Sequence, residues 1–294
     1  MVETFSNCLV CNSNRLEFVN QEKKPWLVKC NNCGFVFSKW IPTSAELHEY
    51  YKEYTDYDYV NEITRNRYLE WVDGLEPYRR MNRILDVGCG DGIFLDQAKK
   101  RGWDVYGTEY AEKWVTRCRE KGINMIHGKL DPKNYEPESF DAIVYMEVIE
   151  HINNPVEELG IASRILRKGG IVFLTTPNYN AISRHLLSTD WNVISYPEHL
   201  CYYTPRTLTK LFREHGFKKI AVDAKGMSPG RLISSYRFGG KEGVDATEMI
   251  RGTDQKLRVQ LESNRGMKFL KNSINFVLNS SGLGDSLHAW FQKM

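Results

Sequence analysis

The pattern of hydrophobic and polar positions changes near residue 80. Beyond that point, short apolar runs alternate with segments that have the spacing and length of helices. The apolar runs predict strands at 83–87, 104–108, 124–127, 140–146, 170–175, 219–223 and 285–292. The segments between them predict helices at 93–101, 111–121, 156–167 and 205–215. This alternation predicts an α/β fold with a mostly parallel, seven-stranded sheet and helices on both faces.

The rest of the chain lacks this alternation. Residues 1–40 are loop-like, and residues 41–80 predict a helical, tyrosine-rich cap, with Thr43 or Ser44 at the start of its first helix and a second helix from 61 to 75. Residues 81–294 form the main domain, in which 226–280 predict a helical insertion before the last strand. We expect this insertion to serve packing or homodimer formation, not chemistry.

Composition and charge exclude several classes of protein. The chain has 294 residues, of which 41% are hydrophobic and 26% charged, with a net charge of +3. It has no run of five or six like charges, which argues against nucleic acid as a partner. No apolar stretch approaches the ~20 residues that span a bilayer, and the N-terminus lacks the features of a secretory signal. We therefore expect a cytoplasmic protein without membrane insertion.

A glycine-rich turn, Gly88–Gly92, follows the strand at 83–87 and precedes a helix. Glycines at 88, 90 and 92 allow a tight turn and let a ligand approach the bare backbone. Dinucleotide sites use G-x-G-x-x-G, but Ile93 stands where the third glycine would be, and there is no phosphate-binding loop. The spacing therefore disfavours a dinucleotide.

A carboxylate follows at the distance expected for a nucleotide site. Glu109 ends the next strand, about twenty residues beyond the turn, where a carboxylate accepts hydrogen bonds from ribose hydroxyls. Asp86 lies in the strand that enters the turn. A merely structural turn is the alternative interpretation, and Glu109 argues against it.

Residues 80–223 resemble the class I methyltransferases that depend on S-adenosyl-L-methionine (SAM). Ile84–Gly92 is similar to their first motif, Glu109 to the second, Phe140–Val144 to the fourth and Leu166–Phe173 to their post-catalytic strand. The resemblance implies a Rossmann-like fold, with SAM held by residues around the turn and the neighbouring strand ends. The residues it implies are Asp86, Gly88, Gly90, Gly92, Glu109, Tyr110, Leu130, Met146 and Glu147, with Tyr57 from the tyrosine-rich connection. Lys129 departs from the family, which more often has an acidic residue there, and Tyr57 could instead pack on the sheet.

Two C-x-x-C pairs lie near the N-terminus. Cys8 and Cys11 are separated from Cys30 and Cys33 by a spacing typical of two-knuckle zinc sites. Four thiolates around Zn²⁺ make a closed, structural site, so we expect a small zinc ribbon that acts as a scaffold or substrate-side lid. Two disulfides are the alternative, which a cytoplasmic location disfavours.

Two acidic and histidine-containing segments are candidates for catalysis. If Glu147–His151 continues as a helical turn, Glu147, Glu150 and His151 share one face. Together with His199 they could bind Mg²⁺ or another divalent ion, an arrangement that resembles small-RNA 2′-O-methyltransferases and, more loosely, ubiquinone O-methyltransferases. In a second interpretation, His199 is a general base, positioned by Glu198 and Tyr196. A third treats His151 and His199 as packing residues.

The sequence leaves several functions open. We expect O-methylation of a small-molecule or glycan acceptor, most plausibly a nucleotide-activated sugar or a glycan precursor of polysaccharide biosynthesis. The four cysteines and the Tyr-x-Glu-His string also resemble sugar C-methyltransferases, although those proteins carry a C-terminal domain that has no counterpart in this sequence. Metal-dependent RNA ribose 2′-O-methylation and a non-catalytic, SAM-binding zinc scaffold are the remaining alternatives.

Overall fold

The computed structural model describes residues 3–43, 45–47, 50, 62–230, 232–233 and 265–294. Internal contacts divide the chain into two units. The ribbon unit consists of residues 1–42, 176–208 and 222–288. The sheet unit consists of residues 43–175, 209–221 and 289–294. The two C-x-x-C pairs therefore belong to a unit that also contains segments from much later in the sequence.

The expected Rossmann-like sheet is present, with seven strands in the order β10-β11-β8-β7-β4-β5-β6. The strands are β4 (Arg83–Val87), β5 (Asp104–Glu109), β6 (Asn124–His127), β7 (Phe140–Met146), β8 (Leu166–Pro177), β10 (Phe217–Lys225) and β11 (Ser286–Lys293). β4 pairs in parallel with β5 on one side and with β7 on the other. The strand order therefore reverses at β4, and ligands of such sheets bind beyond the carboxyl ends of the strands at that point.

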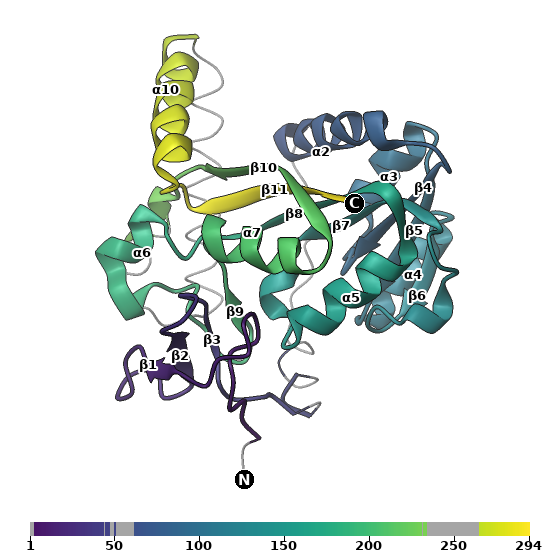
Figure 1. Ribbon diagram of the computed structural model, residues 1–294. Coiled ribbons are helices and arrows are strands. Elements are labelled where there is room, and N and C mark those ends of the chain that lie inside the picture. The colour runs from purple at the N-terminus through teal and green to yellow at the C-terminus, as the bar shows by residue number, and fades with distance from the viewer. Residues whose placement is uncertain (1–2, 44, 48–49, 51–61, 231, 234–264) are drawn as a thin grey trace. The chain divides into compact units, whose positions relative to one another are not determined.

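Helices cover both faces of this sheet, with α2 and α3 on one side and α5 on the other (Figure 1). The helices of the sheet unit are α2 (Glu62–Leu75), α3 (Ile93–Lys100), α4 (Glu112–Glu120) and α5 (Pro155–Ile165), and α7 (Pro205–Glu214) begins in the ribbon unit. Leu75, Phe94 and Val115 of α2, α3 and α4 join Phe173 of β8 in one apolar core. Because these helices bury their apolar faces against the strands, the core fixes the strand ends that carry the site.

The ribbon unit contains a second, four-stranded sheet in the order β1-β2-β3-β9. Its antiparallel strands are β1 (Leu16–Phe18), β2 (Leu27–Cys30), β3 (Val36–Ser38) and β9 (Cys201–Tyr202). The predicted strands do not include the last of these, which forms because β9 pairs with β3 (Figure 1). A two-residue strand whose partner lies more than 160 positions earlier leaves no local periodicity to detect.

Local expectations are mostly confirmed. Thr43 caps its helix: its hydroxyl accepts from the Glu46 amide at 3.2 Å, and Glu46 accepts in return from the Thr43 amide at 2.8 Å. The predicted helix to residue 167 is too long, because Leu166 pairs with Phe140 and is fully buried, so β8 begins there. α6 (Ile182–Leu187) and four short 3₁₀ helices, η1 (Glu76–Tyr78), η2 (Pro132–Asn134), η3 (Ile149–His151) and η4 (Ser188–Asp190), were not predicted.

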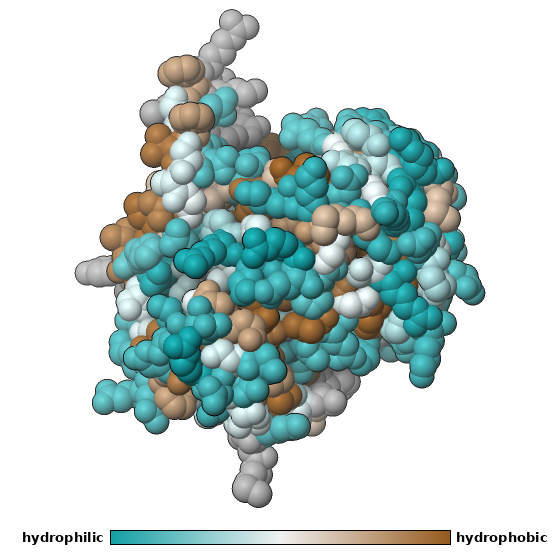
Figure 2. All heavy atoms as spheres, viewed as in Figure 1, coloured by the Kyte–Doolittle hydropathy of each residue, from teal (hydrophilic) through white to brown (hydrophobic). Residues whose placement is uncertain are grey.

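The insertion before the last strand is partly described. α10 (Arg265–Ser281) is helical as expected, whereas 234–264 lie outside the described residues. Phe269, Phe276 and Val277 of α10 are exposed, and tan and brown spheres lie among white and teal ones over this helix in Figure 2. In the part of the chain that the structure describes, no helix combines the length and apolar character needed to span a membrane.

Candidate functional site

The glycine turn exposes its backbone at the carboxyl end of β4. Gly90 has a φ of 53°, a conformation that costs a residue with a side chain roughly 1–2 kcal/mol, and a Cβ added there would meet nothing within 4 Å. This open space is where a ligand can approach the main chain. Gly88 is different, because an added Cβ would lie 2.8 Å from a methyl group of Val148, so the segment after β7 packs directly on the turn.

Glu109, at the end of β5, is fixed by two backbone amides. Its Oε2 accepts from the Gly90 amide at 3.0 Å and its Oε1 from the Ala111 amide at 2.9 Å. The carboxylate is only partly buried, and each oxygen keeps a second acceptor site. A fixed carboxyl acceptor beside an open backbone is suited to bind the two hydroxyls of a ribose.

Asp86, in β4, supplies a second and unusual carboxyl group. It is fully buried, and neither oxygen has a hydrogen-bond partner among the residues that the structure describes. Burial, and then the neighbouring Cys118, Glu109 and Asp91, raise the pKa of Asp86 well above its usual range. An unsatisfied buried carboxyl is costly unless a donor or a cation satisfies it. The ammonium group at the amino-acid end of SAM is a cationic hydrogen-bond donor, which is the kind of partner that this carboxyl lacks.

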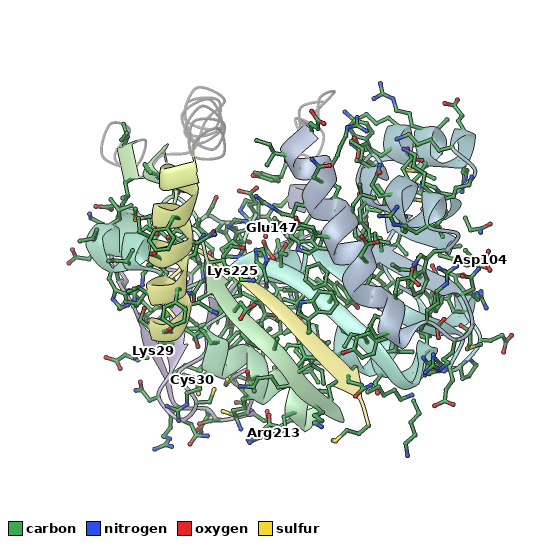
Figure 3. The ribbon with its side chains drawn as sticks, turned by 90° about the horizontal axis from the view of Figure 1, so that it is seen from above. Lys29, Cys30, Asp104, Glu147, Arg213 and Lys225 are labelled. Atoms are coloured by element: carbon green, nitrogen blue, oxygen red, sulfur yellow. The ribbon has the colours of Figure 1, made fainter. Side chains whose placement is uncertain are left out.

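The segment after β7 does not continue as one helical turn. Glu147, labelled in Figure 3, is exposed and adopts a left-handed φ of 55°, and the 3₁₀ helix η3 begins only at Ile149. The expectation that Glu147 shares a helical face with Glu150 and His151 is therefore wrong in its premise. Glu150 is 2% exposed and His151 half-buried, both within η3.

In the ribbon unit, the segment that contains Tyr196, Glu198 and His199 is half-buried and ordered by hydrogen bonds. Nδ1 of His199 lies 2.7 Å from the carbonyl oxygen of Val193. Because a carbonyl can only accept, Nδ1 donates this hydrogen bond, and in the neutral imidazole Nε2 then has the lone pair. The backbone of His199 is held as well, since its amide donates to Ser195 and its carbonyl accepts from the Tyr202 hydroxyl at 2.7 Å.

The four N-terminal cysteines converge in the ribbon unit, where their sulfur atoms all lie within 4.8 Å of one another. The Sγ atoms of Cys8 and Cys33 are 3.5 Å apart and those of Cys11 and Cys30 are 3.6 Å apart. All seven cysteines of the chain are free thiols, so the disulfide alternative is wrong for this structure. The hydrogen bond with Cys8 lowers the pKa of the Cys33 thiol to about 5.

The two knuckles have matching backbones. The amide of Asn12 donates to the Cys8 carbonyl and that of Gly34 to the Cys30 carbonyl, four residues after the first cysteine of each pair. Both donors are left-handed, with φ of 54° for Asn12 and 80° for Gly34. Asparagine is one of the few residues other than glycine that tolerates this conformation, which explains how the first knuckle forms without a glycine.

Comparison with known proteins decides the family. Residues 56–222, more than half of the chain, match a family model described as a methyltransferase domain. The chain belongs to this methyltransferase family. Two curated relatives are named ubiquinone biosynthesis O-methyltransferase. The one from Roseobacter denitrificans is 28% identical over 199 residues, which are 63% of this chain and 78% of the relative. The one from Thiobacillus denitrificans is 28% identical over 204 residues, covering 65% and 86%.

The fold of the methyltransferase agrees with solved structures. A SAM-dependent methyltransferase from Archaeoglobus fulgidus has a TM-score of 0.50 and 17% identity, covering 85% of this chain and all of that one. The family, the relatives and the fold make this chain a SAM-dependent methyltransferase. The relatives are named for ubiquinone biosynthesis, so they lend no support to the sugar-pathway resemblance drawn from the sequence.

The remaining predicted SAM-binding residues of the methyltransferase occupy varied settings. Tyr110 follows β5 and is 63% exposed, Leu130 is buried, and Met146 ends β7 half-buried. Tyr57 lies outside the described residues. Val148 and Val193 were missed. Val148 contributes a contact with Gly88 of another segment, and Val193 contributes a backbone carbonyl, so neither valine carries a chemical signal in the sequence.

Proposed function

We propose that this methyltransferase transfers the SAM methyl group to a hydroxyl of a small organic acceptor, with His199 as general base. The hydrogen bond between His199 Nδ1 and the Val193 carbonyl carries this proposal, because it presents Nε2 as the basic nitrogen. A hydroxyl is a poor nucleophile at neutral pH and needs such a base. The names of the relatives, which are O-methyltransferases, favour oxygen over carbon as the methylated atom.

The chain's own groups have separate tasks in this mechanism. Bound SAM supplies the activated methyl group. Glu109 and the Gly90 backbone would hold its ribose and methionine parts, and Asp86 would face its ammonium group. His199 Nε2 would accept the proton of the acceptor hydroxyl, whose oxygen would take the methyl group as the S–CH3 bond breaks and S-adenosylhomocysteine leaves. The charge that this adds to the imidazole is stabilised by the Val193 carbonyl at Nδ1.

The decisive experiment compares His199→Ala with Glu214→Ala, a surface control in α7. Methyl-labelled SAM is supplied with two acceptor pools, nucleotide sugars and ubiquinone precursors, and the transferred label is measured. We expect His199→Ala to lose about 10²–10⁴-fold in rate while its affinity for SAM is unchanged. Full activity of His199→Ala would overturn the proposal. The pool that becomes labelled identifies the acceptor class. Label in the nucleotide sugars supports the sugar acceptor expected from the sequence, and label in the ubiquinone precursors supports a quinone-type acceptor.

A divalent ion bound by Glu147, Glu150, His151 and His199 stays a prediction. A histidine that donates from Nδ1 to a carbonyl is also suited to bind a metal through Nε2, so the tautomer alone does not separate a base from a ligand. Adding EDTA to the assay separates the two roles. An unchanged rate supports His199 as a base, whereas a loss that Mg²⁺ restores supports the ion.

We also propose that Cys8, Cys11, Cys30 and Cys33 bind a structural Zn²⁺. A tetrahedral site with Zn–S bonds of ~2.3 Å has sulfur–sulfur edges of about 3.8 Å. The paired sulfur distances of 3.5 and 3.6 Å are close to this value. The Val10 and Asn32 amides donate to Cys8 and Cys30 sulfur at 3.4 Å, contacts that stabilise thiolates. Metal analysis should find one zinc per chain, and Cys30→Ser should lose it, whereas Cys201→Ser should keep it.

A further inference from the structure

We propose that the four-cysteine ribbon is a positioning device for His199. It would fix the segment 193–200 and with it the tautomer and orientation of the imidazole. This inference rests on the proposed role of His199, and it concerns how that role is built. All the contacts that carry it lie within the ribbon unit.

The first link is through the backbone. β3 of the ribbon pairs with β9, in the register Val36↔Tyr202 and Phe37↔Cys201. The amide of Ser38 extends this ladder by donating to the carbonyl of Leu200 at 2.7 Å. Tyr202, held in this way, donates its hydroxyl to the carbonyl of His199 at 2.7 Å. The ribbon therefore fixes the main chain directly after His199 and, through one side chain, the main chain of His199 itself.

The second link is aromatic. The ring of Tyr196 lies against Trp26, with centroids 5.8 Å apart, and edge-on to Trp40 at 5.6 Å. Trp26 also stacks on Tyr202, with centroids 6.3 Å apart. Aromatic pairs of this geometry stabilise the contact beyond the area they bury. Two tryptophans of the ribbon thus hold the segment three residues before His199.

The third link reaches the hydrogen-bond acceptor of the imidazole. Val193, whose carbonyl accepts from His199 Nδ1, is 4% exposed and lies in one apolar cluster with Trp26 and Val36 of the ribbon. The next carbonyl, that of Ile194, accepts from Lys24 Nζ at 2.7 Å. The ribbon therefore anchors the atom that determines which nitrogen of His199 carries the proton.

The cysteines connect to these three links through one hairpin. Trp26 directly precedes β2, which ends at Cys30, and β2 leads through the second knuckle into β3. Cys30 is labelled in Figure 3 and is fully buried. A segment of about 40 residues has too little core to hold such a hairpin alone, so a metal at its knuckles would stabilise it. Loss of the metal would then release the segment 193–200.

The test follows the tautomer of His199 by NMR of the full chain labelled with ¹⁵N-histidine, using His199→Gln to assign the resonance. The test variant is Trp40→Leu, with Trp40→Phe as the conservative variant and Phe18→Ala as the control. Phe18 is an exposed aromatic residue of the same ribbon, on β1, at the opposite edge of the sheet from β9. Zinc content and thermal unfolding establish that each variant is folded.

We expect wild type, Trp40→Phe and Phe18→Ala to show His199 protonated at Nδ1 when neutral. In Trp40→Leu both tautomers should be populated, and amide hydrogen exchange over 193–200 should be at least tenfold faster. Removing zinc from the wild type should have the same effect, while calorimetric affinity for SAM stays within twofold. An unchanged tautomer and unchanged exchange in Trp40→Leu and in the zinc-free protein would overturn the inference. These measurements need no methyl acceptor. They can therefore fail independently of the activity assay on His199→Ala, which tests the proposed function itself.

Discussion

The amide of Gly90 donates to Oε2 of Glu109 over 3.0 Å, which ties the glycine turn after β4 to the end of β5. The carboxylate is thereby held at a fixed position beside backbone that faces open space. Both parts of the SAM site that we propose depend on this one contact. It explains why the glycine turn and Glu109 together, and neither of them alone, predict the cofactor.

Replacing Glu109 by alanine should weaken SAM binding by about 10- to 100-fold. The change removes an ionised acceptor, and hydrogen bonds to charged groups contribute roughly 1.5–3 kcal/mol. Equilibrium dialysis with labelled SAM measures the affinity. Glu112→Ala is the matched control, because Glu112 lies three residues further on, in α4, and is paired with His127. Equal losses in the two variants would contradict the assignment of Glu109.

Gly90→Ala should impair SAM binding beyond its effect on stability. Its φ of 53° makes any side chain strained, and the added methyl group would enter the space that a ligand uses. Gly216→Ala is matched, since Gly216 has a φ of 84° and also faces open space, but lies at the amino end of β10. Both variants should lose about 1–2 kcal/mol in urea unfolding, and only Gly90→Ala should lose SAM affinity. A Gly90→Ala variant with normal affinity would refute the placement of the ligand.

Binding of SAM should release a proton from Asp86. Burial raises the pKa of this carboxyl well above its usual range, which favours its neutral form in the free protein. A cationic ligand favours its ionised form and lowers the pKa again. Calorimetric titrations at pH 6 in buffers of different ionisation enthalpy should therefore show release of up to about one proton. Asp86→Asn should show none, and equal enthalpies in all buffers for the wild type would count against the role of Asp86.

Glu158 should make the fold less stable at neutral pH than at acidic pH. Burial raises the pKa of this α5 carboxyl to about 7, although the Tyr145 hydroxyl donates to it at 3.1 Å and opposes the shift. Because the folded-state pKa is the higher one, its stabilisation is fully present below the unfolded value of about 4.3 and is lost as the pH rises through 7.

Urea unfolding of the wild type and Glu158→Gln between pH 4.5 and 8 measures this effect. Glutamine keeps the acceptor for Tyr145 and cannot ionise. The wild type should lose up to about 3 kcal/mol relative to the variant across this range. Parallel curves for the two proteins would show that Glu158 does not titrate as a buried acid.

Elements with local signals could be predicted from the sequence, and long-range contacts could not. β4 spans 83–87 and β7 spans 140–146, both as predicted, because a buried strand between turn residues has its own pattern. β9 is two residues long and exists only through β3. Val193 was missed for a different reason: it acts on His199, six residues later, through a backbone carbonyl that any residue could supply.

In the candidate site, too, the residues with a local sequence signal could be predicted and those that depend on distant contacts could not. Glu109 and the glycine turn could be predicted because their spacing is fixed by one βα unit, and the cysteine cluster because its spacing is fixed by the knuckles. The helical continuation at Glu147 failed because the chain there adopts a left-handed conformation against Thr175, whose carbonyl accepts from the Glu147 amide at 3.0 Å. That contact comes from β8, nearly thirty residues away.

The central claim is that the glycine turn, with Glu109 and Asp86, binds SAM. Isothermal calorimetry of the full chain, titrated with SAM and separately with S-adenosylhomocysteine, tests it most directly. The account predicts one site per chain with micromolar affinity for both ligands. Absence of binding by either ligand to the folded protein would contradict it.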